Sequence, residues 1–191
     1  NIKSTNTNAA YFTLNGDITF SSGGTAASTL QIGDGITGVG KVTKIGSAPL
    51  RITHTNGYSG GTEVSVGSLA VGHTDAIDNG FGHYDATDGT LGSGNVTVDS
   101  TATDLEIESG VAVANVIADT KTLSLAGGGT GGVADKGYAL LDSGINETVG
   151  GLLLGGLPQT TSGTYGSSSS GPPCQSADVF TGSAVIPPPL P

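Results

Sequence analysis

The chain has 191 residues and a formal net charge of −10, with 16 acidic and 6 basic side chains. Without a basic cluster, this balance argues against binding to nucleic acid or to anionic lipid. The chain contains 34 glycines, few aromatic residues, and neither tryptophan nor methionine. Val, Ile and Thr recur in short alternating runs, which favours ordered β structure over disorder. At this length one domain is expected.

A single cysteine, Cys174, rules out a framework of internal disulfides. Two interpretations stay open for it, a free thiol and a disulfide between two copies of the chain. The sequence contains no run of the roughly 18 apolar residues that a membrane span requires. The chain begins at Asn1 without a methionine, and we read it as a mature or excised form whose targeting segments are absent.

The chain opens with polar residues and then turns apolar. Residues 1–10 predict a terminal arm, and residues 11–20 predict two short strands around a turn at Asn15-Gly16. The strands are rich in aromatic side chains, which indicates a cap or an interface. We therefore predict contacts between copies of the chain at Tyr11, Phe12, Phe20 and Cys174.

The clearest repeat unit lies at residues 50–72. Three apolar pairs at spacing i,i+2 predict three short strands with inward side chains, and a glycine-rich corner lies between the first and second. The pairs are Leu50/Ile52, Val64/Val66 and Leu69/Val71. Similar runs later in the chain predict strands around residues 96–98, 105–107, 111–113, 123–125, 138–141 and 152–154.

Residues 73–94 interrupt this pattern and predict an inserted loop. Four carboxylates in it, Asp75, Asp78, Asp85 and Asp88, could bind Ca²⁺, which prefers clustered oxygen ligands. Their spacing matches neither known calcium-loop pattern, so a solvated loop is the favoured interpretation. Phe81 and Tyr84 in the same loop are the contact residues expected of an adhesin.

Four segments follow from these patterns. They are an arm at 1–10, a repetitive β body at 11–157 that includes the insert, a closing segment at 158–186 rich in Ser and Gly, and a tail of prolines at 187–191. The tail fits polyproline II geometry and a linker role.

The expected fold is all-β, a parallel β-helix or β-solenoid with short strands and glycine-rich corners. Strands with one or two inward apolar residues cannot bury a face alone, but stacked coils cover one another. The period predicted from the runs is about 20–25 residues, within the range of solenoids. The alternative is a β-sandwich or jelly roll, against which the very short strands and scarce aromatic residues count.

A family resemblance rests on the segment from Gly40 to Gly72. Its core is similar to the Asn-x-Tyr-Ser-Gly-Gly-Thr signature of the autotransporter-associated β-strand repeat, a bacterial passenger repeat. The closing segment of the chain is similar to that of such proteins in environmental bacteria. The matching residues are Asn56, Tyr58, Gly60, Gly61 and Thr62. The resemblance implies a parallel β-helix that is exported and displayed outside the cell. The long insert and the proline-rich end depart from the family pattern.

No motif in the sequence predicts catalysis. Arg51 is the only arginine. Because it lies between the inward residues Leu50 and Ile52, its side chain should point outward, and we expect it to be an ordinary surface charge. We therefore expect a non-enzymatic extracellular structural protein without a cofactor. It is a β-solenoid subunit that is displayed on the cell surface or stacks head to tail with copies of itself into a filament. The alternative is an adhesin that binds glycans through the 73–94 loop, and a carbohydrate-active enzyme ranks third.

Overall fold

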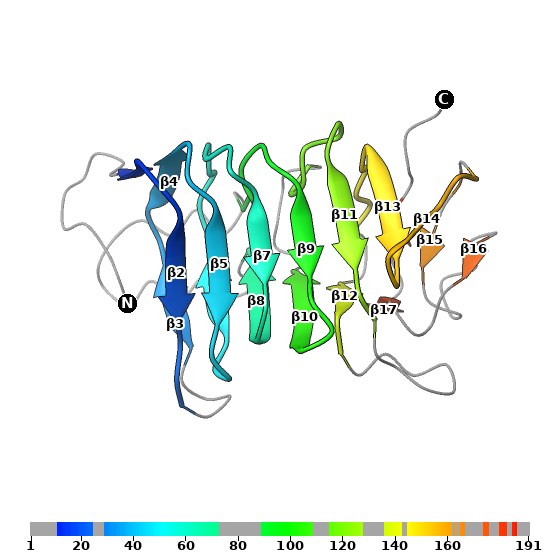
Figure 1. The fold of residues 1–191 in the computed structure, drawn as a ribbon, viewed down its shortest axis with the longest axis horizontal. Coiled ribbons are helices and arrows are strands. Elements are labelled where there is room, and N and C mark those ends of the chain that lie inside the picture. Colours follow the sequence, from blue (N-terminus) through cyan, green and yellow to red (C-terminus); the bar gives the residue numbers. More distant parts are fainter. Residues whose placement is uncertain are drawn as a thin grey trace.

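The computed structural model describes residues 11–24, 29–72, 89–108, 115–127, 136–142 and 145–161, and also residues 163, 165–166, 174–175, 180–182 and 185–186. The described residues form 18 strands and no helix, so the all-β prediction is confirmed. The strands lie side by side along the longest axis of the molecule and follow the order of the chain from one end to the other (Figure 1).

The largest sheet has seven strands in the order β14-β13-β11-β9-β7-β5-β2. Its pairs are parallel except for the last, β13–β14. The strands are β2 (Ile18–Ser21), β5 (Val42–Ile45), β7 (Thr62–Val64), β9 (Val96–Val98), β11 (Thr122–Leu125), β13 (Gly151–Leu154) and β14 (Leu157–Pro158).

A second sheet of six strands is parallel throughout, with the order β17-β12-β10-β8-β6-β3. From β5 to β12 the chain alternates between the two large sheets, so each sheet gains its strands in chain order. The six strands are β3 (Leu30–Ile32), β6 (Leu50–Ile52), β8 (Gly67–Val71), β10 (Ala102–Ile107), β12 (Tyr138–Leu141) and β17 (Phe180–Gly182).

Two small sheets complete the described strands. Near the N-terminal end, β1 (Tyr11–Leu14) pairs in parallel with β4 (Gly35–Gly38). Near the other end, β15 (Tyr165–Gly166) pairs with β16 (Cys174–Gln175) and with β18 (Val185–Ile186).

The β1–β4 side continues along the molecule as segments without regular strands. The amide of Gly57 donates to the carbonyl of Ile36 at 2.8 Å, and the amide of Ser93 donates to the carbonyl of Tyr58 at 2.8 Å. Farther along, Leu91 donates to Val116 at 2.8 Å. The body therefore has three sides, two formed by the large sheets and one formed by these segments.

The core consists of side chains that repeat at equivalent positions of neighbouring strands. Burial of each large apolar side chain contributes roughly 1.5–3 kcal/mol. In the seven-stranded sheet one such column contains Ile18, Val42, Thr62, Val96, Leu123 and Leu152. In the six-stranded sheet the corresponding column contains Leu30, Leu50, Leu69, Leu105 and Ala139. The column members on β2 and β3, Ile18 and Leu30, are only partly buried.

The predicted period holds only in the first part of the chain. Equivalent positions advance by 20 and 19 residues from Leu30 to Leu50 to Leu69 (50 − 30 and 69 − 50). The next steps, to Leu105 and then Ala139, are 36 and 34 residues (105 − 69 and 139 − 105). Most of the added residues fall between strands, and within β10 the register against β8 shifts between Ala102 and Leu105.

One apolar pair of the repeat unit was predicted wrongly. Val66 is 39% exposed, and the buried pair on β7 is Thr62 and Val64. Val66 instead lies in the turn that joins β7 to β8, where its amide donates to the carbonyl of Lys44. A buried threonine therefore takes the place that apolar periodicity alone assigned to a valine.

The predicted limits of the 73–94 insert also need correction. Residues 73–88 lie outside the described residues, but residues 89–94 pack in the body of the fold. Leu91 is fully buried in the core, and a Cβ atom built on Gly89 would lie 2.9 Å from the amide nitrogen of Gly72. Gly72 and Gly89, the described residues on either side of 73–88, thus lie next to each other in the body.

Candidate functional site

Asn56, the first residue of the repeat motif, links three successive segments of the third side. Its Oδ1 accepts from the amide of Ile36 at 2.7 Å. Its Nδ2 donates to the carbonyls of Thr90 at 2.7 Å and His54 at 2.6 Å. The side chain thus continues the hydrogen bonding between segments where no regular strand forms, and all of its polar atoms are used.

Tyr58 and Thr62 form a buried pair inside the same turn of chain. The ring of Tyr58 is fully buried, and its hydroxyl lies 2.6 Å from Oγ1 of Thr62. Thr62 also donates to the carbonyl of Leu91 at 3.3 Å. Burial raises the pKa of the Tyr58 phenol well above its ordinary value, so this hydroxyl serves as a neutral hydrogen-bonding group of the core.

The two glycines of the motif allow neighbouring segments to approach closely. A Cβ atom on Gly60 would lie 2.4 Å from backbone atoms of Gly40 and Lys41. Gly61 has φ of +90°, a conformation that favours glycine. All five residues of the motif therefore serve packing and hydrogen bonding, and none of their side chains is presented on the surface for a ligand.

The N-terminal end of the fold carries an apolar opening. A cavity of about 260 Å³ is lined there by Phe12, Thr13, Leu14, Ile18, Phe20, Ile32 and Ile36, which we call the N-terminal patch. Phe12 is 40% exposed, whereas Phe20 is partly buried against the core. Two of the residues predicted to contact another copy, Phe12 and Phe20, are thus brought together in one surface.

Tyr11 lies beside the patch and is held in place although it is 54% exposed. Its ring packs over Gly35, where a Cβ atom would come within 2.4 Å of the ring carbons. It also meets the ring of His54 edge-on, with 5.7 Å between the ring centres. Tyr11 therefore contacts two other segments of the chain, at Gly35 and at His54.

The opposite end of the seven-stranded sheet is closed by a hairpin. Strand β14 folds back on β13 through Gly155-Gly156, both with positive φ, as two-residue hairpins require. The amide of Gln159 donates to the carbonyl of Leu152 at 2.8 Å. Pro158, one residue earlier, therefore faces away from β13 and offers the outer edge no N–H group.

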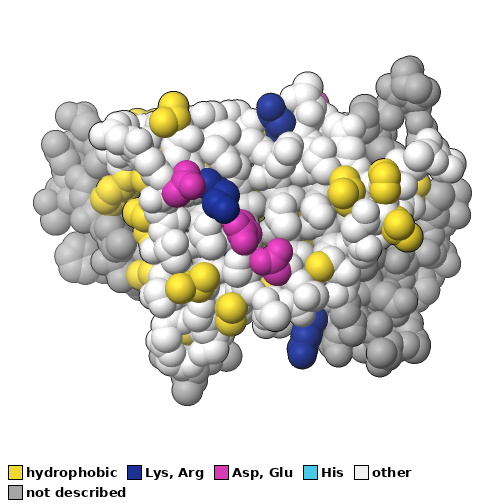
Figure 2. Space-filling model, viewed as in Figure 1, with side chains coloured by type: hydrophobic (Ala, Val, Ile, Leu, Met, Phe, Trp, Pro, Cys, Tyr) yellow, Lys and Arg dark blue, Asp and Glu magenta, His cyan; other side chains and the backbone are white. Residues whose placement is uncertain are grey.

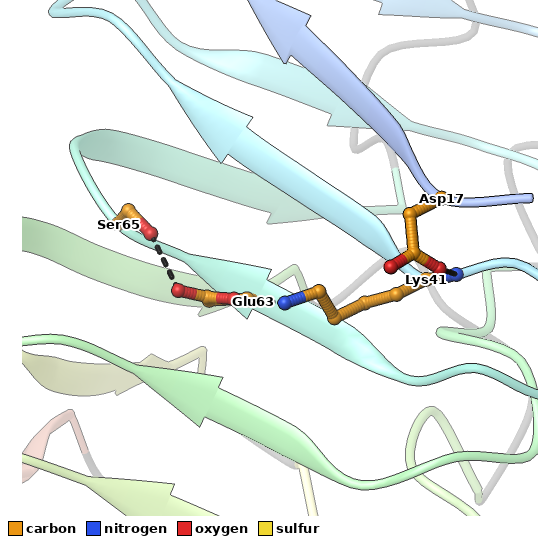
Figure 3. A network of polar contacts seen from close by, with 4 residues as sticks. All are labelled: Asp17, Lys41, Glu63 and Ser65. Atoms are coloured by element: carbon orange, nitrogen blue, oxygen red, sulfur yellow. Dashed lines mark hydrogen bonds and ion pairs between the residues drawn. The ribbon is translucent and has the colours of Figure 1, made fainter.

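Charged side chains cross the outer face of the seven-stranded sheet in a short line (Figure 2). Lys41 Nζ lies 2.5 Å from Glu63, Ser65 donates to Glu63 at 2.9 Å, and Asp17 accepts from the amide of Lys41 at 2.8 Å (Figure 3). The bond to Glu63 raises the pKa of Lys41, and bonds from Lys41 and Ser65 lower the pKa of Glu63. Such partly exposed pairs contribute under about 1 kcal/mol.

The outer face of the six-stranded sheet carries a second charged group. Arg51 points outward, as predicted, and reaches across Ala70 on β8 to form an ion pair with Glu108. Burial and repulsion from Glu108 and Asp104 raise the pKa of Glu106. The sequence analysis missed this acidic group, although the alternation of Asp104, Glu106 and Glu108 indicates a single face.

Two charged side chains are buried in the body and bond to the backbone. Lys44 Nζ donates to the carbonyls of Ile45, Gly46 and Val66 at 2.9, 2.6 and 2.9 Å. Burial lowers the pKa of Lys44 to about 8.

Glu147 is the acidic counterpart on the third side. It accepts from the amides of Val116 and Ile117 at 3.0 and 2.7 Å. Burial nevertheless raises the pKa of Glu147 to about 7. Lys44 bonds to carbonyls at the end of β5 and in the turn before β8, and Glu147 bonds to amides of a segment without regular strands. We therefore assign both side chains structural roles.

The other predicted site residues cannot be placed. Asp75, Asp78, Asp85, Asp88, Phe81 and Tyr84 lie outside the described residues, and of Cys174 only its position on β16 is described. Among the described residues, no group of three or more His, Cys, Asp or Glu is arranged to hold a metal ion. The described part of the chain also contains no helix long and apolar enough to cross a membrane.

Comparisons with protein-family models, with curated proteins and with solved structures find no match. The resemblance to the autotransporter-associated repeat therefore stays a prediction that rests on the residues quoted for it.

Proposed function

We propose that the chain is a parallel β-solenoid that serves as a non-enzymatic structural unit outside a bacterial cell. The coiled architecture is supported by the alternation of the chain between two parallel sheets and by the matched register of the inward columns from β5 through β7 to β9 and from β6 to β8. Each coil covers the next, which is how short strands gain a common core.

The structural role is supported most directly by the repeat motif. Its polar residues are used inside the body, Asn56 between segments and Tyr58 with Thr62 in the core. A motif that recruited ligand or substrate would present at least some of these groups to solvent. Placement outside the cell rests on composition and on the family resemblance.

Association of copies at the ends of the solenoid is part of the proposal. Strands that end a sheet offer unpaired backbone groups to another chain. A head-to-tail contact could join β17 of one copy to β3 of the next, because these strands terminate the six-stranded sheet. The seven-stranded sheet does not continue in the same way, since the hairpin with Pro158 ends it.

The alternative function is an adhesin that binds glycans through the insert. It is favoured by the closeness of Gly72 and Gly89, because the residues between them begin and end at one corner of the fold. Replacement of residues 74–87 by a short Gly-Ser linker should abolish glycan binding if this alternative is correct, and should leave the body folded in either case.

The location of the protein relative to the producing cell tests the main proposal. Antibodies raised against the purified chain should label the surface of intact producing cells or material outside them, as seen by immunogold electron microscopy. Label confined to the cytoplasm of sectioned cells would contradict the proposal.

A further inference from the structure

Two Asn-Gly dipeptides among the described residues have contrasting surroundings. They are Asn15-Gly16 and Asn56-Gly57, and a third, Asn79-Gly80, lies outside the described residues. In an Asn-Gly pair the backbone nitrogen of glycine can attack the side-chain carbonyl carbon of asparagine, because glycine has no Cβ atom to block the approach. The folded structure decides whether each pair can reach the geometry that this attack needs.

Asn15-Gly16 is open to this reaction. Both residues are exposed and lie in the bend between β1 and β2, outside any regular strand. No hydrogen bond joins the Asn15 side chain or the Gly16 amide to any described residue. A Cβ atom built on Gly16 would meet no other atom within 4 Å. The asparagine side chain can therefore turn towards the Gly16 nitrogen without breaking a hydrogen bond of the described fold.

Asn56-Gly57 is held by hydrogen bonds in the third side. The amide of Gly57 donates to the carbonyl of Ile36 at 2.8 Å, so the attacking nitrogen is already engaged. The Asn56 side chain forms the three further hydrogen bonds described above. Attack would require the loss of these bonds in a residue that is only 6% exposed. Local opening of this segment must therefore come before any reaction of Asn56.

From this contrast we propose that Asn15-Gly16 is a site of spontaneous deamidation in the folded protein, whereas Asn56-Gly57 stays intact. Hydroxide removes the proton of the Gly16 amide, and the nitrogen then forms a bond to Cγ of Asn15. The bond from Cγ to the side-chain nitrogen breaks, ammonia leaves with a proton from water, and a cyclic succinimide remains. Water then adds to one of the two ring carbonyls and opens the ring, which gives aspartate or isoaspartate at position 15.

The isoaspartyl product alters the first corner of the fold. The connections 15–17 and 39–41 have equal length, because the strands on either side of them are in register. They pack closely, since a Cβ atom on Gly40 would lie 1.9 Å from the carbonyl oxygen of Gly16. Isoaspartate carries the backbone through the former side chain and adds one methylene group to connection 15–17 alone. The modified corner therefore no longer matches its neighbour.

Peptide mapping by mass spectrometry tests the site. The purified full chain is incubated at mildly alkaline pH in water enriched in heavy oxygen, which enters the product when the succinimide opens. We expect Asn15 to convert at least about 30-fold faster than Asn56 in the folded protein, equivalent to about 2 kcal/mol at 1.36 kcal/mol per factor of ten. In denaturing urea the two rates should approach each other, because both pairs are then equally free to react.

Two glycine substitutions provide a matched pair. Gly16→Ala places its Cβ in open space, so the fold should be kept, but this Cβ obstructs the attacking nitrogen and should slow the conversion of Asn15. Gly57→Ala should leave the rate at Asn15 unchanged. Its Cβ would meet only the side chain of Thr37, at 3.9 Å, so this variant should also fold.

Urea unfolding tests the altered corner. The Asn15→Asp variant carries the new charge on an ordinary backbone and should unfold at the same urea concentration as the unmodified chain. The isoaspartyl form, separated by chromatography after incubation, should unfold at a lower urea concentration.

Two results would overturn the assignment of the site. One is that Asn15 stays intact in the folded chain while it converts in urea. The other is that Asn56 converts as fast as Asn15 without urea. An isoaspartyl chain that unfolds together with Asn15→Asp would contradict the altered corner. None of these results bears on the location of the protein or on its end-to-end association, which have their own tests.

Discussion

Buried polar side chains in this protein bond mainly to the backbone of neighbouring segments. Asn56 bonds between segments of the third side, Lys44 holds three carbonyls at a corner, and Glu147 holds two amides. A buried backbone group left unpaired costs about as much as a lost hydrogen bond. These residues therefore act where the regular ladders of the sheets end.

The Tyr58 hydroxyl provides the first test at the scale of the residue. Tyr58→Phe keeps the packing of the ring but removes the partner of Thr62. We expect a loss of about 1–2 kcal/mol in the free energy of unfolding, measured by urea titration. Tyr11→Phe is the control, because Tyr11 is largely exposed, and its effect should be near zero. Equal effects of the two substitutions would contradict the assigned role of Tyr58.

The lowered pKa of Lys44 predicts that the free energy of unfolding rises at alkaline pH. Its pKa is about 8 in the folded protein and 10.5 ordinarily, so between these values the unfolded chain binds the extra proton. The free energy of unfolding should therefore increase with pH in this window. Lys44→Met should remove that increase between pH 8 and 9.5.

Lys41→Met serves as the matched control for Lys44. The bond to Glu63 raises the pKa of Lys41, so this residue stays protonated in both states within the same window. The slope of stability against pH should be the same in Lys41→Met as in the unmodified protein. A slope that persists in Lys44→Met would show that Lys44 is not the titrating group.

The raised pKa of Glu147 predicts that the free energy of unfolding falls as pH rises through the acidic range. Its pKa is about 7 in the folded protein and 4.5 ordinarily, so the folded state binds the extra proton between these values. Stability contributed by Glu147 should fall as pH rises from 4.5 to 7, and Glu147→Gln should flatten this fall. Glu63→Gln is the control, because the pKa of Glu63 is lowered and its contribution changes only below pH 4.5.

At the scale of the element, glycines set how closely successive turns of chain approach. Gly40 packs against the corner at Gly16, and a Cβ atom on Gly40 would lie 1.9 Å from the carbonyl oxygen of Gly16. Gly60 packs against Gly40 in the same way. The same corner is thus repeated in three successive turns, and the register of the strands depends on it.

Substitution of Gly40 tests this dependence. Gly40→Ala forces the backbones apart and should lower the free energy of unfolding by at least about 2 kcal/mol, as overpacking does. Gly16→Ala places its Cβ in open space and should change stability by less than about 0.5 kcal/mol. Thermal unfolding of the two variants makes the comparison. Similar midpoints for the two would contradict the close approach at this corner.

Alternation of apolar and polar residues predicted many of the strands, because pairs of inward apolar residues such as Leu50 with Ile52 and Val96 with Val98 can be recognised in the sequence. It did not predict Thr62 in the core, since a buried threonine depends on hydrogen-bond partners, Tyr58 nearby and Leu91 far along the chain, that alternation does not reveal. The inward position of Lys44 follows from its parity with Val42, but its acceptors belong to a corner that only the folded chain brings together. Phe12 and Phe20 were predicted as interface residues, whereas their shared cavity depends on Ile32 and Ile36 from other strands.

At the scale of the whole molecule, the strands of both large sheets follow one another along the longest axis, as the proposed solenoid requires (Figure 1). A column of equivalent inward positions runs through the seven-stranded sheet from β2 to β13. Stability of such a body comes from contacts between neighbouring turns. The outer face of the seven-stranded sheet then places Thr19, Thr43, Glu63, Thr97 and Ser124 in one row.

A distance along this row tests the solenoid most directly. Spin labels at Thr19→Cys and Ser124→Cys, in a Cys174→Ser background and with unlabelled protein in excess, report one intramolecular distance by pulsed electron resonance. The labelled strands β2 and β11 are separated by four steps in the sheet, or about 19 Å at about 4.8 Å per step. We predict a single narrow distribution within about 10 Å of this value. A distribution centred beyond about 35 Å, or one without a defined maximum, would contradict the stacked fold.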